Sequence, residues 1–264
     1  MIRLAIAGAT GWTGGAIAEG ALAAPDIDLK AAVARRAAGQ DLGTALGREP
    51  LGIRVLGDVR EALEGVDVLV EFTSHTDAKR IALTAVERGV AVVIGSSGLS
   101  ADDFAEVDAA AREAGVGAVA AGNFSLTAAM MLAGASLAAR VIPQWEIVDY
   151  AKSTKPDAPS GTARELAERL REVRDAQVDL PPAEVAGHPE ARGATIAGSQ
   201  VHSVRLPSFI VSTEIVFAAA DERLSIRHDA GATAAPYVEG VLLAVRKVRE
   251  RAGLTRGLDR LLLA

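Results

Sequence analysis

The sequence predicts an α/β protein: an N-terminal Rossmann-type, doubly wound parallel sheet, followed by a second α+β domain built on a mixed sheet. The first domain is indicated by an N-terminal strand that runs into a glycine-rich turn, and by strands that alternate with helices. The second is indicated by β-branched and apolar runs after residue 200 that no helix separates. We place the domains at residues 1–124 and 125–232, and expect residues 233–264, with a helix at 237–251, to pack back on the first.

Composition narrows the possible partners. Half of the 264 residues are hydrophobic, but only 3% are aromatic, so Ala, Val, Leu and Ile must build the core. A net charge of −6 argues against nucleic acid as the main partner. Cysteine is absent, the four histidines lie far apart, and no apolar run is long enough to span a bilayer. We therefore expect a cytoplasmic protein with no bound metal and no membrane or nucleic-acid partner.

The first element is a strand at residues 2–7, which leads into GATGWTGG and a helix at residues 16–24. Glycines in such a turn let the backbone approach a pyrophosphate and bring the helix against the strand. The spacing is GxxGxxG, and a purely structural glycine turn is the alternative interpretation. The pattern predicts that a dinucleotide cofactor binds at this turn, which contains Gly8, Ala9, Thr10, Gly11, Trp12 and Thr13.

The second strand, at residues 29–33, ends in Ala34, Arg35 and Arg36. In folds that prefer NAD, an acidic residue at this strand end binds the ribose hydroxyls. Here the acid is missing, and two guanidinium groups suit a ribose phosphate. We expect NADPH as the cofactor, with NADH possible; the alternative is two solvated arginines in a loop.

The remaining elements of the first domain follow in order. After a loop at residues 39–57 we expect strands at 66–73, 90–94 and 116–120, and helices at 76–88 and 101–113. Small-residue loops follow the last two strands, at the sheet edge where open α/β sheets bind ligands. These loops add Gly95, Ser96 and Ser97, then Gly122, Asn123, Phe124 and Ser125, to the predicted cofactor site.

The second domain is predicted to begin with a long helix at residues 125–140 and a strand at 146–150. Further strands are expected at residues 201–206, 209–217 and 223–228, and a flexible, Pro- and Gly-containing loop at 178–195.

The segment KPDAPSGTA carries the clearest chemistry of the second domain. Lys152 and Lys155 precede a Pro-bracketed turn, and Ser160, Gly161 and Thr162 then begin a helix. The start of a helix offers unpaired N–H groups and a positive dipole end, which together favour a carboxylate. The segment therefore predicts a site for a small acid, although a simple helix cap beside solvated lysines remains the alternative.

GATGWTG, GSSG, GNFS and KPDAPSGTA, in this order, resemble the dihydrodipicolinate reductase family of bacterial lysine and diaminopimelate biosynthesis. The resemblance covers nearly the whole chain. It implies an NAD(P)H-dependent reductase of a small carboxylated cyclic imine, assembled as a homotetramer through the sheet of the second domain. It also implies that Lys155 is catalytic and that Ser160, Gly161 and Thr162 bind the substrate carboxylate.

One part of the family pattern is missing. The family's E-x-H-H-x-H-K run reads Asp149, Ala151, Lys152 and Thr154 at its first four named positions, so the histidine to which proton transfer is usually assigned is an alanine. We expect Lys155 to be the acid, with its pKa lowered by Lys152, or else Tyr150 or a water molecule. The departure also leaves open a paralogous imine reductase or amine-forming dehydrogenase. A catalytically silent cofactor-binding protein is a third possibility, against which the retained Lys155 argues.

Overall fold

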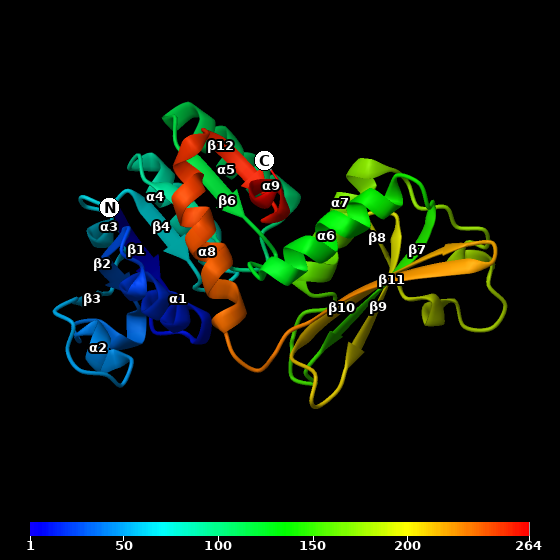
Figure 1. Cartoon of the computed structure of the whole chain (residues 1–264), viewed down its shortest axis with the longest axis horizontal. Helices are drawn as coiled ribbons and strands as arrows, with labels where there is room; N and C mark the ends of the chain where they lie inside the picture. The colour runs from blue at the N-terminus through cyan, green and yellow to red at the C-terminus, as the bar shows by residue number, and fades with distance from the viewer. Residues whose placement is uncertain (264) are drawn as a thin grey trace. The chain divides into compact units, whose positions relative to one another are not determined.

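The computed structural model describes residues 1–263 and divides the chain into two compact units (Figure 1). Of the described residues, the first unit comprises 1–126 and 234–263, and the second comprises 127–233. Ser125 thus lies in the first unit, although the sequence placed it in the second domain. In residues 1–263, no helix is both long and apolar enough to cross a bilayer.

The first unit is built on a seven-stranded sheet in the order β12-β6-β5-β4-β1-β2-β3. Every pair of neighbouring strands in this sheet is parallel. This topology confirms the predicted Rossmann-type fold. The strands are β1 (Ile2–Ala7), β2 (Ile27–Val33), β3 (Val55–Leu56), β4 (Val68–Glu71), β5 (Ala91–Ile94), β6 (Gly117–Ala120) and β12 (Gly253–Arg256).

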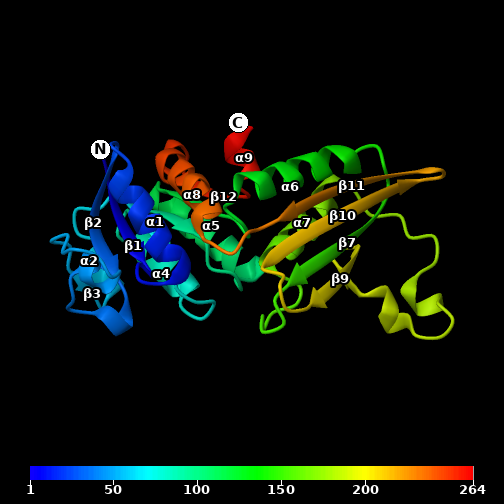
Figure 2. The same cartoon turned by 60° about the horizontal axis from the view of Figure 1, so that its bottom comes forward.

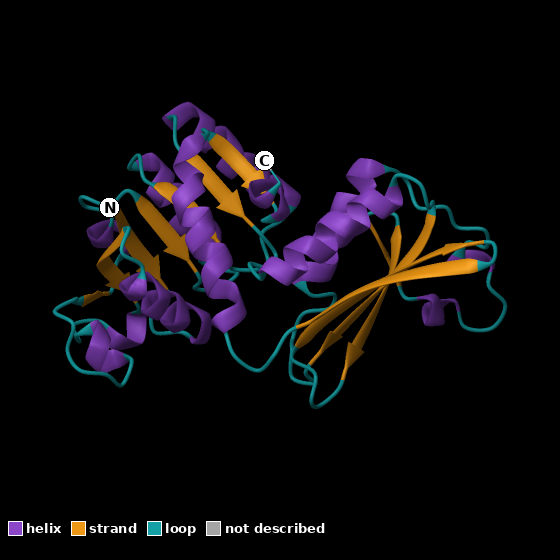
Figure 3. Ribbon diagram, in the orientation of Figure 1, coloured by secondary structure: helices purple, strands orange, loops and turns teal. Residues whose placement is uncertain are grey.

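Helices cover both faces of this sheet, as a doubly wound fold requires (Figure 3). One face holds α1 (Trp12–Ala23) and α8 (Ala235–Lys247), which contact each other. The other face holds α3 (Val59–Ala62), α4 (Ala78–Glu87) and α5 (Ala101–Ala114), whose apolar side chains share one core with the strands. The shorter elements are η1 (Arg35–Ala37), α2 (Leu42–Ala45), η4 (Val248–Glu250) and α9 (Asp259–Leu262).

The second unit is built on a five-stranded sheet in the order β11-β10-β7-β9-β8. Only β7 and β9 pair in parallel, so the sheet is mixed, as predicted. Figure 2 shows α6 and α7 on one side of this sheet. The elements are α6 (Leu126–Ala139), β7 (Gln144–Ala151), α7 (Gly161–Val173), η2 (Pro182–Glu184), η3 (Pro189–Arg192), β8 (Ala194–Ile196), β9 (Ser199–Arg205), β10 (Val211–Ala219) and β11 (Glu222–Asp229).

Strict alternation along β7 separates the two faces of the second sheet. Trp145, Ile147 and Asp149 are buried, and the first two lie in the core that α6 and α7 complete. Glu146 and Tyr150 alternate with these residues and are only partly buried, on the opposite face. Asp149 is therefore a carboxylate on an otherwise apolar side of the strand.

Several predicted boundaries were wrong. The first helix starts at Trp12, four residues before its predicted start, and the predicted loop at 39–57 contains α2 and β3. The last long helix ends at Lys247 and is followed by η4 and then by β12, a strand that the sequence analysis missed. Only one residue of β12, Leu254, is strongly apolar, and its backbone pairs with β6, more than 130 residues earlier in the chain. Local patterns do not report such a pairing.

Candidate active site

The strands of the first sheet bring the predicted cofactor loops to one edge. Because all neighbouring strands are parallel, their carboxyl ends lie at the same edge. Backbone hydrogen bonds continue the register into the loops: Gly8 N donates to Val33 O at 2.8 Å, and Gly95 N donates to Glu71 O at 2.9 Å. Since β4 lies between β1 and β5 in the sheet, the glycine turn after β1 and the GSSG loop after β5 flank the end of β4.

Two glycines of the first turn have no room for a side chain. Gly8 has a φ of +87°, and a Cβ on it would lie 2.1 Å from the carbonyl oxygen of Phe72. A Cβ on Gly14 would lie 2.1 Å from the carbonyl oxygen of Gly8. The turn is thus tight, and it leads directly into α1, whose N-cap, Gly11, makes no side-chain cap. The amides at the start of α1 are left for an anion such as a pyrophosphate.

A cavity of about 600 Å³ opens beside this turn. Among its lining residues are five of the predicted cofactor residues: Gly8, Thr10, Gly11, Arg35 and Arg36. The structure thus brings the glycine turn and the two arginines into one cavity. Ala9, Trp12 and Thr13, and the predicted residues of the two later loops, do not line it.

Two further arginines, Arg60 and Arg80, line the same cavity and were missed by the sequence analysis. Arg60 lies in the short α3, and Arg80 lies in the first turn of α4. Asp77 contacts both Arg80, at 3.0 Å, and Arg35, at 3.5 Å. The hydrogen bond from Arg80 is the largest cause of the lowered pKa of Asp77. Four guanidinium groups and the carboxylates of Asp58 and Asp77 give the cavity a net positive lining, which suits a phosphate.

Glu71, the last residue of β4, is a second residue that the sequence analysis missed. Its carboxylate is fully buried, and its Oε1 accepts hydrogen bonds from Thr73 N at 2.7 Å and from Ser96 Oγ at 2.9 Å. Burial raises the pKa of Glu71, although these hydrogen bonds oppose the shift. The only signal in the sequence is an acid that ends an apolar strand. Glu71 joins the loop after β4 to the GSSG loop.

The remaining predicted cofactor residues lie in structured surroundings. Asn123 Oδ1 accepts a hydrogen bond from Ser125 N at 2.8 Å, which closes the GNFS loop. Phe124 is buried, with its ring centroid 5.9 Å from that of Phe72. Trp12 is 57% exposed and packs edge-on against Tyr237.

In the second unit, the KPDAPSGTA segment ends at the N-terminus of α7. Ser160 is the N-cap: its hydroxyl accepts a hydrogen bond from Ala163 N at 3.3 Å, so the capping role considered as an alternative does occur. Gly161 and Thr162 form the first turn, whose amides point out of the helix end. A cap and an anion site are compatible, because the Ser160 hydroxyl still has a proton to donate.

The two lysines of this segment differ. Lys155 Nζ lies 2.6 Å from Asp157 Oδ1, and the Lys155 side chain is 21% exposed. Lys152 is exposed. Lys155 holds the pKa of Asp157 below its usual value, although burial of Asp157 acts in the other direction. The Lys155 ammonium thus has an anionic neighbour that the sequence argument, based on Lys152, did not include.

Tyr150, the other proposed acid, faces a different cluster. Its hydroxyl donates to Glu214 Oε2 at 3.3 Å, and the guanidinium of Arg227 lies 4.9 Å from the centre of its ring. Burial and the Glu214 carboxylate raise the pKa of Tyr150. Because side chains alternate along β7, Tyr150 lies on the face of the sheet opposite Asp149, the residue that contacts Ser160.

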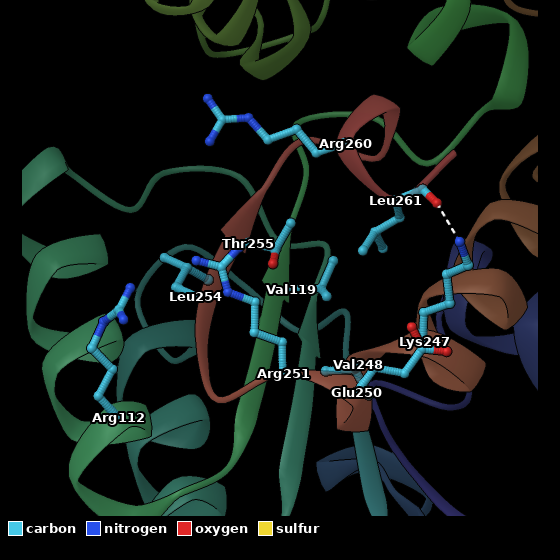
Figure 4. Close-up of a pocket in the computed structure, with 10 residues that line it drawn as sticks. All are labelled: Arg112, Val119, Lys247, Val248, Glu250, Arg251, Leu254, Thr255, Arg260 and Leu261. Atoms are coloured by element: carbon cyan, nitrogen blue, oxygen red, sulfur yellow. Dashed lines mark hydrogen bonds between the residues drawn. The ribbon is translucent and has the colours of Figure 1, made fainter. Parts of the chain in front are cut away.

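A second cavity, of about 330 Å³, lies in the first unit between η4, β12 and α9 (Figure 4). Two of its cations are already bonded: Arg112 to Asp108 at 2.8 Å, and Lys247 to the carbonyl of Leu261 at 2.7 Å. None of the residues predicted from the sequence to bind cofactor or substrate lines this cavity.

Comparisons with known proteins all point to one family. The family model described as dihydrodipicolinate reductase, N-terminus, matches residues 2–124, and the corresponding C-terminus model matches residues 123–262. A 4-hydroxy-tetrahydrodipicolinate reductase from Moorella thermoacetica is 40% identical over 99% of this chain and 98% of its own length. The protein of the same name from Synechococcus elongatus is 37% identical, again over 99% of this chain and 98% of its own length.

Solved structures agree with this result. A dipicolinate-bound dihydrodipicolinate reductase from Paenisporosarcina sp. TG-14 superposes with a TM-score of 0.78 at 29% identity, covering 98% of this chain and 99% of the other. An amine dehydrogenase from Mycobacterium smegmatis, at 18% identity and a TM-score of 0.70, covers 98% of this chain and 95% of its own and shares the fold. The chain described here belongs to the dihydrodipicolinate reductase family.

Proposed function

We propose that this protein is an NADPH-dependent reductase of a small carboxylated cyclic imine, acting as a 4-hydroxy-tetrahydrodipicolinate reductase of lysine and diaminopimelate biosynthesis. The observation that carries the proposal is the retained KPDAPSGTA segment, which combines Lys155 with the N-terminus of α7 in a chain 40% identical to a reductase of that name. The proposed imine substrate is a small anion because it carries a carboxylate, and the N-terminus of a helix attracts anions.

The choice of NADPH rests on the cavity beside the glycine turn. The absence of an acid after β2 removes the usual partner of a free ribose diol, and Arg35, Arg36, Arg60 and Arg80 offer guanidinium groups for a phosphate. The amides at the start of α1, beside Gly8 and Gly14, would hold the pyrophosphate. We propose that the GSSG and GNFS loops hold the nicotinamide end.

The reaction requires a hydride on a ring carbon of the imine or α,β-unsaturated imine, and a proton on the nitrogen or on its carbanion equivalent. The reduced nicotinamide supplies the hydride when it is bound. Lys155 donates an ammonium proton to the nitrogen or carbanion that becomes negative as hydride is added, and regains one from solvent, while Asp157 keeps the ammonium in place before transfer. Ser160, Gly161 and Thr162 hold a substrate carboxylate through the helix end, and Lys152 adds positive charge.

Lys155 is a better candidate than Tyr150 for the proton donor. Tyr150 is bonded to Glu214 on the opposite face of the sheet, and its raised pKa makes it a weaker acid. Ala151, at the position of the family's histidine, is fully buried and carries no proton to donate. A water molecule held by Lys155 remains compatible with this proposal.

Ala151 also favours a second candidate function. If the family reaction needs a histidine at this position, the chain is a paralogous imine reductase or amine-forming dehydrogenase with a different carboxylated substrate.

We further propose a cytoplasmic homotetramer assembled through the partly buried sheet face that carries Glu146 and Tyr150.

The two candidates are separated by a turnover assay. The purified protein is mixed with substrate freshly made by the preceding synthase, and oxidation of NADPH is followed, with NADH in parallel. Rapid NADPH-dependent turnover is the expected result. A protein that binds NADPH, by fluorescence, but does not reduce this imine would contradict the biosynthetic assignment and favour the paralogue.

A further inference from the structure

Arg205, the last residue of β9, makes a set of contacts that no sequence motif predicted. Its side chain is 17% exposed, and it forms an ion pair at 2.7 Å with the fully buried Asp149 of β7. We infer that Arg205 is a positioning residue of the acid-binding loop, defined as residues 155–162. This inference rests on the proposed function, because it assigns the loop a carboxylate ligand.

The guanidinium group of Arg205 donates hydrogen bonds to β7, to β9 and to the acid-binding loop. Arg205 Nη2 donates to Asp149 Oδ2 at 2.7 Å and to the backbone carbonyl of Asp157 at 2.9 Å. Its Nη1 donates to the backbone carbonyls of Asp149, at 3.2 Å, and Val204, at 3.0 Å. The contact to Asp157 holds the middle of the loop, two residues after Lys155.

Asp149 connects Arg205 to the N-terminus of α7. The same Oδ2 that receives Arg205 accepts hydrogen bonds from the backbone N–H of Ser160, at 2.8 Å, and from the hydroxyl of Ser203, at 3.3 Å. The ion pair therefore fixes the loop at Asp157 directly and at Ser160 through Asp149. Hydrogen bonds to ionised partners are stronger and more directional than neutral ones, so this arrangement restricts the loop before a ligand binds.

Arg205 also neutralises a negative charge near the N-terminus of α7. Asp149 is a buried carboxylate in direct contact with the N-cap of α7, where a substrate carboxylate is proposed to bind. Without a cation beside it, that negative charge would repel the ligand and would be costly to bury. Arg205 cancels the charge of Asp149 beside the N-cap of α7.

Two substitutions separate the positioning role from the charge. Arg205→Lys keeps the positive charge but has no fork to reach Asp149 and the Asp157 carbonyl together. Arg205→Gln removes the charge as well. The matched control is Arg171→Lys, which changes an ion pair with Asp175 near the other end of the same helix.

The experiment compares the variants as full-length protein. Hydrogen–deuterium exchange is measured on the peptide covering residues 155–163, and the affinity for dipicolinate, the ligand of the Paenisporosarcina reductase, is measured by calorimetry with NADPH present. For Arg205→Lys we expect faster exchange in that peptide and at least about tenfold weaker dipicolinate binding, with unchanged NADPH affinity. Arg171→Lys should match the wild type in all three.

Different failures have different meanings. Unchanged exchange in Arg205→Lys, or faster exchange with unchanged dipicolinate affinity, overturns the positioning role. Loss of NADPH binding together with dipicolinate binding in Arg205→Lys points to general destabilisation and also overturns it. A wild-type protein that does not bind dipicolinate overturns the carboxylate site of the proposed function, and the exchange measurement then decides alone whether Arg205 orders the loop.

Discussion

The hydroxyl of Ser96 donates a 2.9 Å hydrogen bond to the carboxylate of Glu71, a group with no exposed surface. The same oxygen of Glu71 accepts a hydrogen bond from the backbone N–H of Thr73. One buried acid thus ties together two loops at the edge of the sheet where the cofactor is proposed to bind. This connection suggests a test of stability against pH.

Glu71→Gln is expected to remove a pH-dependent loss of stability. The pKa of Glu71 is raised in the folded protein, so the native state holds a proton that the unfolded state releases. Wild-type stability from this group is therefore greatest below about pH 4.5, the ordinary value, and falls as pH rises through the folded pKa. Glutamine keeps an acceptor for Ser96 and Thr73 but does not titrate. The measurement is urea unfolding of both proteins at acidic and neutral pH. A stability difference that does not change with pH would contradict the raised pKa.

Asp67 should show the opposite dependence. Arg3 bonds both oxygens of Asp67, and this side-chain hydrogen bond is the largest cause that lowers the pKa of Asp67 to about 2. Its contribution to stability is therefore present above the ordinary pKa near 3.8 and is lost as pH falls towards 2. Asp67→Asn should cost about 1 kcal/mol at neutral pH, since Arg3 is half exposed, and almost nothing near pH 2. Equal destabilisation at both pH values would show that the cost is not electrostatic.

Replacing both Arg35 and Arg36 with alanine should weaken the binding of NADPH much more than the binding of NADH. The two nucleotides differ by the ribose phosphate, and both arginines line the cavity beside the glycine turn. We expect an increase of about tenfold in the KM for NADPH and little change for NADH, measured in parallel. Arg48→Ala is the control, because Arg48 pairs with Glu19 and does not line the cavity. If the preference for NADPH over NADH did not change, the ribose phosphate would either contact Arg60 and Arg80 instead or not bind in this cavity.

Lys155→Ala should abolish most turnover while leaving NADPH affinity nearly unchanged. Loss of a general acid commonly costs about 10²- to 10⁴-fold in rate. Lys155→Arg, which keeps a positive charge opposite Asp157 but is a poor proton donor, should bind dipicolinate better than Lys155→Ala and remain slow. Full activity in either variant would remove Lys155 as the acid.

The parts of the fold that depend on short stretches of sequence were predictable. The strand, glycine turn and helix at the N-terminus follow from residues 2–24 alone, because a short apolar run and glycine spacing act locally. β12 was missed because its pairing with β6 joins residues far apart in the chain. The early start of α1 was missed because Gly14 and Gly15 read as turn residues, although close packing against Gly8 is what requires Gly14.

The candidate site divides in the same way. Gly8, Thr10, Gly11, Arg35 and Arg36 come from contiguous motifs, and the structure places them in one cavity. Arg60, Arg80 and Arg205 were given no role from the sequence, and only the folded chain brings each of them to its neighbours. The effect of Asp157 on Lys155 was also missed, because a charge two residues away can point in any direction in a loop.

The transfer of hydride to a carboxylated imine is tested most directly with isotopically labelled cofactor. NADPH carrying deuterium at the transferable position of its nicotinamide is incubated with the protein and freshly made imine, and the product is analysed by mass spectrometry. We predict a product reduced by one hydride and one proton, with a single deuterium on a ring carbon, formed with NADPH faster than with NADH. An unlabelled product, or consumption of the imine that does not depend on the reduced cofactor, would contradict the proposed reaction.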